Sequence, residues 1–267
     1  MSTQFTQQSQ VVLLGTGSVI PNARRLATSH LLLTSNDRIL VDCGPGAAHR
    51  LAEAGYLPKD LTRILVTHLH ADHCSELASI VLSAFLQGRE TALPIYGPQG
   101  TRQHVDLVFN QLFGYIPRLL SARGKKFDIP VIEVNPETVI EDGIKITCAK
   151  VIHGPILALG YRVDTEDGSV GFSGDTAPCE DLITLVKGVD LLIHECPYPD
   201  KNGPHPAHTI PNQLGPIAAK VESPALAMNH FFPMCDSSRE DMIESVARDY
   251  SGDIIFGEDL MTISVRK

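Results

Sequence analysis

The stretch Arg63–His73, with the sequence RILVTHLHADH, decides how the rest of the chain is interpreted. Its apolar part, Ile64–Thr67, predicts a buried strand, and the polar residues begin where that strand ends. Three histidines and one aspartate within the six residues His68–His73 would be poor core residues but good ligands for a divalent metal ion. This donor set favours Zn(II), with Mn(II) or Fe(II) as alternatives. The competing interpretation is a solvated polar turn that holds no metal.

Three further candidate ligands follow apolar stretches later in the chain. His153 comes after the apolar residues 146–152, Asp175 closes the segment Val170–Asp175, and His230 follows another apolar run. A ligand at the end of a strand is held by a rigid sheet while its side chain faces the open edge. Each of these residues alone is more often a hydrogen-bonded surface or core residue. Their occurrence together, in this order, is what indicates a metal site.

These motifs resemble those of the metallo-β-lactamase superfamily, and within it the ribonuclease Z and arylsulfatase-like branch. The resemblance spans nearly the whole chain and is carried by Gly15–Gly17, Val41–Gly44, Thr67–His73, Tyr96–Pro98, Ser173–Thr176, Leu192–Glu195 and Asn229–Phe231. It implies an α/β fold, a four-layer αββα sandwich of two mixed β-sheets flanked by helices. We expect residues 1–267 to form a single domain of this kind.

The resemblance also assigns the candidate ligands to two metal ions that share one carboxylate. The assigned ligands are His68, His70 and His153 for one ion, Asp72, His73 and His230 for the other, and Asp175 as the bridge. A hydroxide between the ions would attack the substrate. Asp72 is then also a catalytic residue, because it can orient that hydroxide or accept its proton.

A second pair of catalytic residues is implied by the same branch. Ribonuclease Z enzymes have a His-Glu-Ala-Thr and a His-Ser-Thr motif, whose glutamate and histidine assist the leaving group. Glu195 and His208 match these positions, although the residues around them differ from the motifs. We expect Glu195 to keep His208 protonated, so that His208 can act as the general acid. Asp42 is expected to support a metal ligand by hydrogen bonding.

The pattern of apolar residues predicts alternating strands and helices. Strands are predicted at 11–14, 30–34, 39–41, 64–67, 131–134, 144–152, 158–163, 170–172, 189–193, 225–228 and 253–255. Helices are predicted at 46–54, 75–87, 179–187, 210–221 and 239–248.

Two segments interrupt this alternation. Pro98–Gly124 has apolar residues at helical spacing and predicts a helix packed on the core, with a lid or a homodimer face around Phe109 and Phe113 as alternatives. Residues 197–206 contain four prolines and predict a stiff loop beside the metals that leads into His208.

Composition indicates the cellular setting. The chain has 267 residues, 43% of them hydrophobic, and no apolar stretch long enough for a membrane-spanning helix. The polar start Ser2–Gln4 lacks the features of a signal peptide, so we expect a cytoplasmic protein. Six cysteines without paired spacing are expected to be reduced thiols.

The substrate is expected to be small and anionic. The net charge of −9 disfavours a long polyanion, whereas two divalent ions offset by Asp72, Asp175 and hydroxide would leave a local charge of about +1. Ribonuclease Z enzymes typically carry a long tRNA-gripping arm where this chain has only six residues between Val163 and Val170. Both observations favour a small ester, a phosphodiester first, and make tRNA a disfavoured partner.

Several alternatives stay open. The same two ions could serve an arylsulfatase or a carboxylic ester or lactone hydrolase, and a ribonuclease Z-type endonuclease acting at the 3′ end of tRNA is a further candidate. An iron-dependent oxygenase or redox protein would use the same scaffold, and a metal-binding protein without catalysis is the third class. Five other histidines match no ligand position: His30, His49, His104, His194 and His205.

Overall fold

Two β-sheets form the centre of the computed structural model, which describes residues 8–122, 124, 127–136, 138–141 and 143–267. The first sheet has the spatial order β14-β1-β2-β3-β4-β5-β6, made of β1 (Gln10–Gly15), β2 (Ser29–Leu33), β3 (Arg38–Val41), β4 (Arg63–Leu65), β5 (Ile95–Gly97), β6 (Val131–Glu133) and β14 (Met261–Ser264). The second has the order β13-β12-β11-β10-β9-β8-β7, made of β7 (Ile140–Glu141), β8 (Lys145–His153), β9 (Ile156–Asp164), β10 (Ser169–Phe172), β11 (Leu191–Glu195), β12 (Ala225–Asn229) and β13 (Asp253–Phe256).

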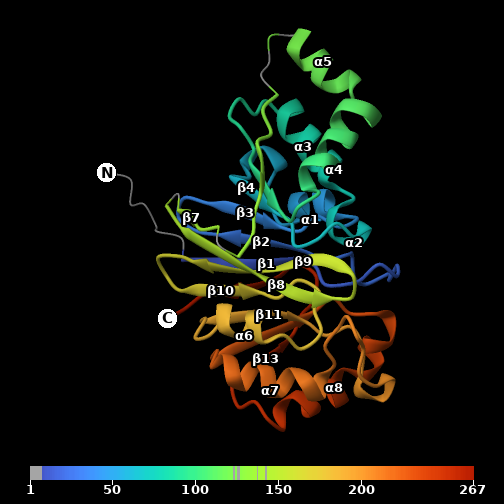
Figure 1. The fold of residues 1–267 in the computed structure, drawn as a ribbon, viewed down its shortest axis with the longest axis vertical. Coiled ribbons are helices and arrows are strands. Elements are labelled where there is room, and N and C mark those ends of the chain that lie inside the picture. The colour runs from blue at the N-terminus through green and yellow to red at the C-terminus, as the bar shows by residue number, and fades with distance from the viewer. Residues whose placement is uncertain (1–7, 123, 125–126, 137, 142) are drawn as a thin grey trace.

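Helices cover the outer face of each sheet (Figure 1). Those that follow strands of the first sheet are α1 (Ala47–Glu53), α2 (Ala71–Cys74), α3 (Leu77–Leu86), α4 (Thr101–Asp106) and α5 (Tyr115–Ala122), with a π-helical segment η2 (Leu107–Leu112) and a 3₁₀ turn η1 (Pro58–Asp60). Those of the second half are α6 (Glu180–Leu185), α7 (Pro211–Val221) and α8 (Arg239–Ala247), with 3₁₀ turns η3 (Asp200–Asn202) and η4 (Pro233–Ser238).

Strand β1 shows how the layers are held together. Side chains alternate between the two faces of a strand, and Val11 and Leu13 pack between the sheets while Val12 and Leu14 pack under the helices of the first half. Because both faces are buried, the sequence of the strand is a continuous apolar run and does not alternate between apolar and polar residues. A third apolar cluster lies between the second sheet and α6, α7 and α8. The four-layer αββα sandwich of two mixed sheets predicted from the sequence is therefore confirmed.

Strand direction brings the ends of several strands to one edge. Strands β10, β11 and β12 are parallel to one another, and β8 points the same way because both β8 and β10 are antiparallel to β9. The loops that follow these strands therefore leave the second sheet on the same side. The turn between β9 and β10 is as short as predicted, and Thr165 N donates to Gly168 O at 2.8 Å.

The structure corrects the sequence prediction in a few places. Strands β5, β7 and β14 were not predicted, and the helix predicted at 75–87 is α3, which begins two residues later. The single helix predicted within Pro98–Gly124 is divided into α4, η2 and α5. Phe109 is buried as predicted, but Leu112 and Tyr115 are 64% and 62% exposed. The prediction that this segment packs on the core is thus right as far as Phe109 and wrong from Leu112 to Tyr115.

Two other predictions agree with the structure. All six cysteines are free and buried. Within the part of the chain that the structure describes, no helix combines the length and the apolar character that crossing a membrane requires.

One polar side chain, His30 on β2, lies in the core between the sheets. Its ring stacks on Phe172 at a centroid distance of 5.9 Å, and its Nε2 accepts a 2.7 Å hydrogen bond from Asn229. Burial, together with the nearby His73 and His230, lowers the pKa of His30 from 6.5 to about 3. The imidazole is therefore neutral in the folded protein at every pH at which the chain is expected to work.

This buried histidine predicts a loss of stability in mild acid. The unfolded chain binds a proton at His30 below pH 6.5, and the folded chain does not. The free energy of unfolding is therefore unaffected by this group above pH 6.5 and decreases as the pH falls below it. Between pH 7 and pH 5 the free energy of unfolding should fall by about 2 kcal/mol through this group alone. In urea unfolding of metal-free protein, His30→Gln should reduce the pH dependence by that amount.

The matched control is His49→Gln, because the His49 side chain is 76% exposed. This control should keep the wild-type pH dependence. An equal pH dependence in His30→Gln and wild type would show that His30 is not held neutral by burial.

Candidate metal centre

Nine histidine, aspartate and glutamate residues from different parts of the chain meet at one edge of the sandwich. They are His68, His70, Asp72 and His73 in the turn after β4 and in α2, His153 at the end of β8, Asp175 after β10, Glu195 at the end of β11, His208 in the loop before α7, and His230 directly after β12.

The turn after β4 is fixed by Asp42, which follows β3. The Asp42 carboxylate accepts hydrogen bonds from Thr67 N at 2.7 Å and Thr67 Oγ1 at 2.8 Å, and lies 2.8 Å from His73 Nδ1. Gly44 lets the β3 turn pass directly against α2, since a Cβ at this position would lie 2.0 Å from Asp72 O. The predicted support of a candidate ligand by Asp42 is thus present as a hydrogen bond to His73.

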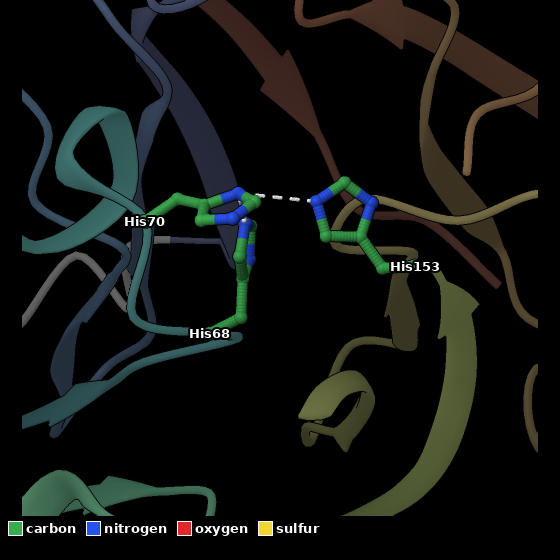
Figure 2. Close-up of side chains that lie close together, drawn as sticks. All are labelled: His68, His70 and His153. Carbon is green, nitrogen blue, oxygen red and sulfur yellow. Dashed lines mark hydrogen bonds between the residues drawn. The ribbon is translucent and has the colours of Figure 1, made fainter. Parts of the chain in front are cut away.

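The first group of candidate ligands is His68, His70 and His153 (Figure 2). Figure 2 shows the rings of His70 and His153 facing each other from opposite segments, with His68 beside His70. His70 Nδ1 lies 3.0 Å from His68 Nε2 and 3.1 Å from His153 Nε2. Three nitrogen atoms thus converge on one small volume.

The second group is Asp72, His73 and His230, and Asp175 lies between the two groups. His230 Nε2 is 3.3 Å from Asp72 Oδ2 and also 3.3 Å from Asp175 Oδ2. Asp175 Oδ1 is 3.3 Å from His73 Nε2, and its Oδ2 is 3.8 Å from His153 Nε2. The structure therefore brings together all seven residues that the sequence assigned to the metal site. His208 and Glu195 lie close enough to join further triads with some of them, and the division into two ion sites stays a prediction.

The hydrogen bonds of the ligands fit a metal centre. Nδ1 of His73 donates to Asp42 and Nδ1 of His153 donates to Ala207 O at 3.0 Å, so Nε2 is the nitrogen of each ring that faces the cluster. His73 Nε2 is buried and has no well-aligned hydrogen-bond partner among the described residues. Imidazole nitrogen atoms with carboxylates are a donor set that divalent zinc prefers.

The electrostatics also fit a cation. Burial lowers the pKa of His68 well below its usual value, which leaves this imidazole neutral and able to bind a metal. At His73 burial opposes the charged form, but the carboxylates of Asp175 and Asp42 outweigh it and raise the pKa well above its usual value. The centre of the cluster therefore stabilises positive charge, which a metal ion supplies without protonating a ligand.

Glu195 and His208 form a buried pair beside these groups. His208 Nδ1 lies 2.8 Å from Glu195 Oε2, and Thr176 N donates to Glu195 Oε1. Burial raises the pKa of Glu195 well above its usual value and lowers that of His208 to about 3. Both shifts favour the neutral form of the group, and the expectation that Glu195 keeps His208 protonated stays a prediction.

The two groups open into a cleft of about 310 Å³ whose lining includes two apolar side chains, Val19 and Phe232. Sequence reasoning assigned neither to the site. Each could have been suspected from a nearby motif, because Phe232 comes two residues after His230 and Val19 two residues after Gly15–Gly17. A larger cavity of about 720 Å³ lies between α4, η2 and α5, away from these ligands.

The five histidines that match no ligand position lie outside the metal-ligand groups found among the described residues. Two of them are nevertheless close to the site. Nδ1 of His194 donates to Glu195 O at 2.8 Å, and the ring of His205 lies 4.9 Å from that of His208.

Comparisons with known proteins show the family and the fold of the chain. A model of the beta-lactamase superfamily domain matches residues 37–231. A ribonuclease Z of Mycobacterium avium (strain 104) is 31% identical over 274 residues, covering 96% of this chain and 98% of that protein. The metallo-beta-lactamase fold protein YhfI from Bacillus subtilis superposes with a TM-score of 0.76 at 21% identity, covering 96% and 98% of the two chains. Human tRNase Z, short form, gives 0.74 at 22% identity, covering 97% and 100%.

The ligand geometry predicts that Zn(II) stabilises the folded chain. A ligand that binds only the folded state at about 100 times its Kd raises the free energy of unfolding by about 2.7 kcal/mol. Adding Zn(II) to chelator-stripped protein should give a rise of this size in urea unfolding, and His68→Gln should reduce it. His49→Gln should respond like wild type. Equal stabilisation of all three proteins would place zinc elsewhere.

Proposed function

Since the chain belongs to the metallo-β-lactamase superfamily of hydrolases, we propose that it holds two divalent metal ions, Zn(II) first, and hydrolyses a phosphodiester. The observation that carries this proposal is the pair of three-residue ligand groups on either side of Asp175. His68, His70 and His153 would hold one ion, and Asp72, His73 and His230 would hold the other. Asp175 would lie within reach of both.

Two bound ions supply a nucleophile from water at neutral pH and neutralise charge on the reacting phosphoryl group. The residues of the chain position the water and the metal ligands. Asp72, at the edge of the open cleft, would orient the water and accept its proton. Asp42 and Ala207 O fix the ring orientations of His73 and His153 and so keep their Nε2 atoms facing the cluster.

Glu195 and His208 deliver a proton to the leaving oxygen. We assign one transferable proton to the pair and place it on Glu195, in line with the raised pKa of its carboxyl group and the lowered pKa of His208, so that Glu195 donates to His208 Nδ1. His208 Nε2–H gives its proton to the departing oxygen while Nδ1 takes the proton of Glu195. Glu195 ends as a carboxylate and His208 stays neutral, so no charged imidazole forms in the buried site.

The cleft favours a small anionic ester as substrate. The cluster carries two carboxylates against two divalent ions, which leaves a local positive charge on a chain whose net charge is −9. Arylsulfates, carboxylic esters and lactones are alternatives that need the same ions. Parallel assays on diester, sulfate and lactone substrates with the zinc, manganese and iron forms separate these classes.

A second candidate function, cleavage at the 3′ end of precursor tRNA, is favoured by one specific observation. The Mycobacterium avium relative named ribonuclease Z aligns with this chain over 98% of its own length. Precursor tRNA cut once at its 3′ boundary would favour this candidate, whereas intact precursor alongside turnover of a small diester would favour the first.

Removal of the bridging carboxylate predicts the largest loss. Asp175→Asn keeps the shape of the side chain but removes its charge, so the zinc content should fall below two ions per chain. The kcat/KM on bis(p-nitrophenyl) phosphate should fall about 100-fold or more. Elemental analysis and initial rates measure both quantities.

Asp181→Asn is the matched control, since Asp181 is exposed on α6. It should retain two ions and wild-type rates. Wild-type protein that carries one iron atom after purification without added metal would instead support the iron-dependent alternative.

The proton relay predicts a dependence on the leaving group. His208→Ala should lower kcat on a methyl ester by about 10²- to 10⁴-fold, because methoxide needs a proton to leave. It should have little effect on a p-nitrophenyl ester, whose leaving group is stable as an anion. Turnover of the methyl ester should also decline as rising pH removes the proton from Glu195. Equal losses on both esters would exclude the relay.

A further inference from the structure

We propose that Tyr198, His205 and Phe232 form an aromatic platform that stacks the base of a nucleoside leaving group. The inference rests on the proposed phosphodiesterase function and narrows its substrate to esters whose departing alcohol carries a flat aromatic ring.

The three rings form one continuous surface beside the proposed acid. The ring of Tyr198 lies 4.7 Å from that of Phe232 and 5.6 Å from that of His205. His205 is in turn 4.9 Å from His208, and Tyr198 is 5.9 Å from His208. Phe232 also reaches the metal ligand His230, at 6.4 Å. Each of the three platform residues is half-exposed, so part of each ring is free to contact a ligand.

The position of His208 identifies which part of the substrate meets this surface. His208 gives its proton to the leaving oxygen, so the group attached to that oxygen must lie next to His208. On the metal side His208 is surrounded by His153 and His230, at 5.0 and 5.8 Å between ring centroids. Of the three platform rings, Phe232 lines the cleft together with Val19, and Tyr198 and His205 adjoin it on the other side of His208. The leaving group is therefore directed onto aromatic and apolar side chains.

The platform is built to stay in place. Tyr198 and His205 belong to the loop with four prolines, which restrict its backbone. Phe232 N and Cys235 Sγ both donate to Pro197 O, at 3.2 and 2.9 Å. Asp200 in the same loop accepts hydrogen bonds from Asn212 N and Ser245 Oγ. A stacking surface that is rigid before binding loses little entropy when the ligand arrives.

Aromatic rings favour a flat partner over an aliphatic one. Nucleobases stack on aromatic side chains, and every base offers a π-face for this contact. A simple alkyl alcohol would cover less of the platform. Because stacking contacts ring faces and leaves base edges unread, the platform should accept purines and pyrimidines alike.

The test compares two esters that differ only in the base. Deoxyadenosine 3′-(methyl phosphate) and its abasic counterpart share the same sugar, ester and leaving oxygen. The zinc-loaded protein should hydrolyse the first with about tenfold higher kcat/KM, a ratio typical of one base–aromatic stack. Product analysis should find free deoxyadenosine with methyl phosphate, which shows that the nucleoside left.

Variants of the platform should lower this ratio. Tyr198→Leu and Phe232→Leu retain apolar volume without a ring and should bring the ratio toward one, whereas Tyr115→Ala on the exposed α5 should keep the wild-type ratio. A platform with only a structural role would lower both rates together and leave the ratio unchanged, which would overturn the inference.

Binding provides a second measurement that does not need catalysis. The fluorescence of 2-aminopurine deoxyriboside 3′-(methyl phosphate) should be quenched on binding to metal-free protein, and less so by Tyr198→Leu. Hydrolysis of both esters at equal rates would overturn the platform alone. No hydrolysis of either diester by the zinc-loaded protein would overturn the proposed function and this inference with it.

Discussion

The buried carboxylate of Asp175 is the constraint on which the site depends. Burial opposes its ionisation, yet the neighbouring His230 and His73 hold its pKa well below its usual value. A charge in such a position is stable only when positive charge or hydrogen bonds surround it. The histidines of both ligand groups converge on Asp175 and supply these surroundings. The same requirement explains why imidazoles from four separate segments approach one carboxylate so closely.

The sandwich fold makes this convergence possible. The ligands follow β4 of one sheet and β8, β10 and β12 of the other, and the apolar layer between the sheets sets the distance between these two edges. Residues with positive φ, Asp42 at 58° and His230 at 60°, turn the chain sharply where it leaves a strand. Such backbone is uncommon outside glycine and is stabilised here by the surrounding contacts. The geometry of the site therefore depends on the packing of the two sheets.

Local motifs were predictable from the sequence, and contacts between distant segments were predictable only in part. The stretch His68–His73 shows its chemistry in six residues, and continuous apolar runs such as that of β1 show burial on both faces. His153, Asp175 and His230 needed the family resemblance, because a single residue after a strand has no distinctive pattern. The stacking of Tyr198 on Phe232 and the place of Val19 in the cleft lining depend on tertiary packing that no local spacing encodes. The position of the proton within Glu195 and His208 depends on burial, which a sequence does not specify.

A crystal structure of the zinc-loaded protein, with anomalous scattering recorded at the zinc edge, tests the central claim most directly. The account predicts two anomalous peaks about 3.5 to 4 Å apart. Asp175 should contact both ions, either through one shared carboxylate oxygen or through one oxygen to each ion. A single peak, or two peaks that Asp175 does not connect, would contradict it.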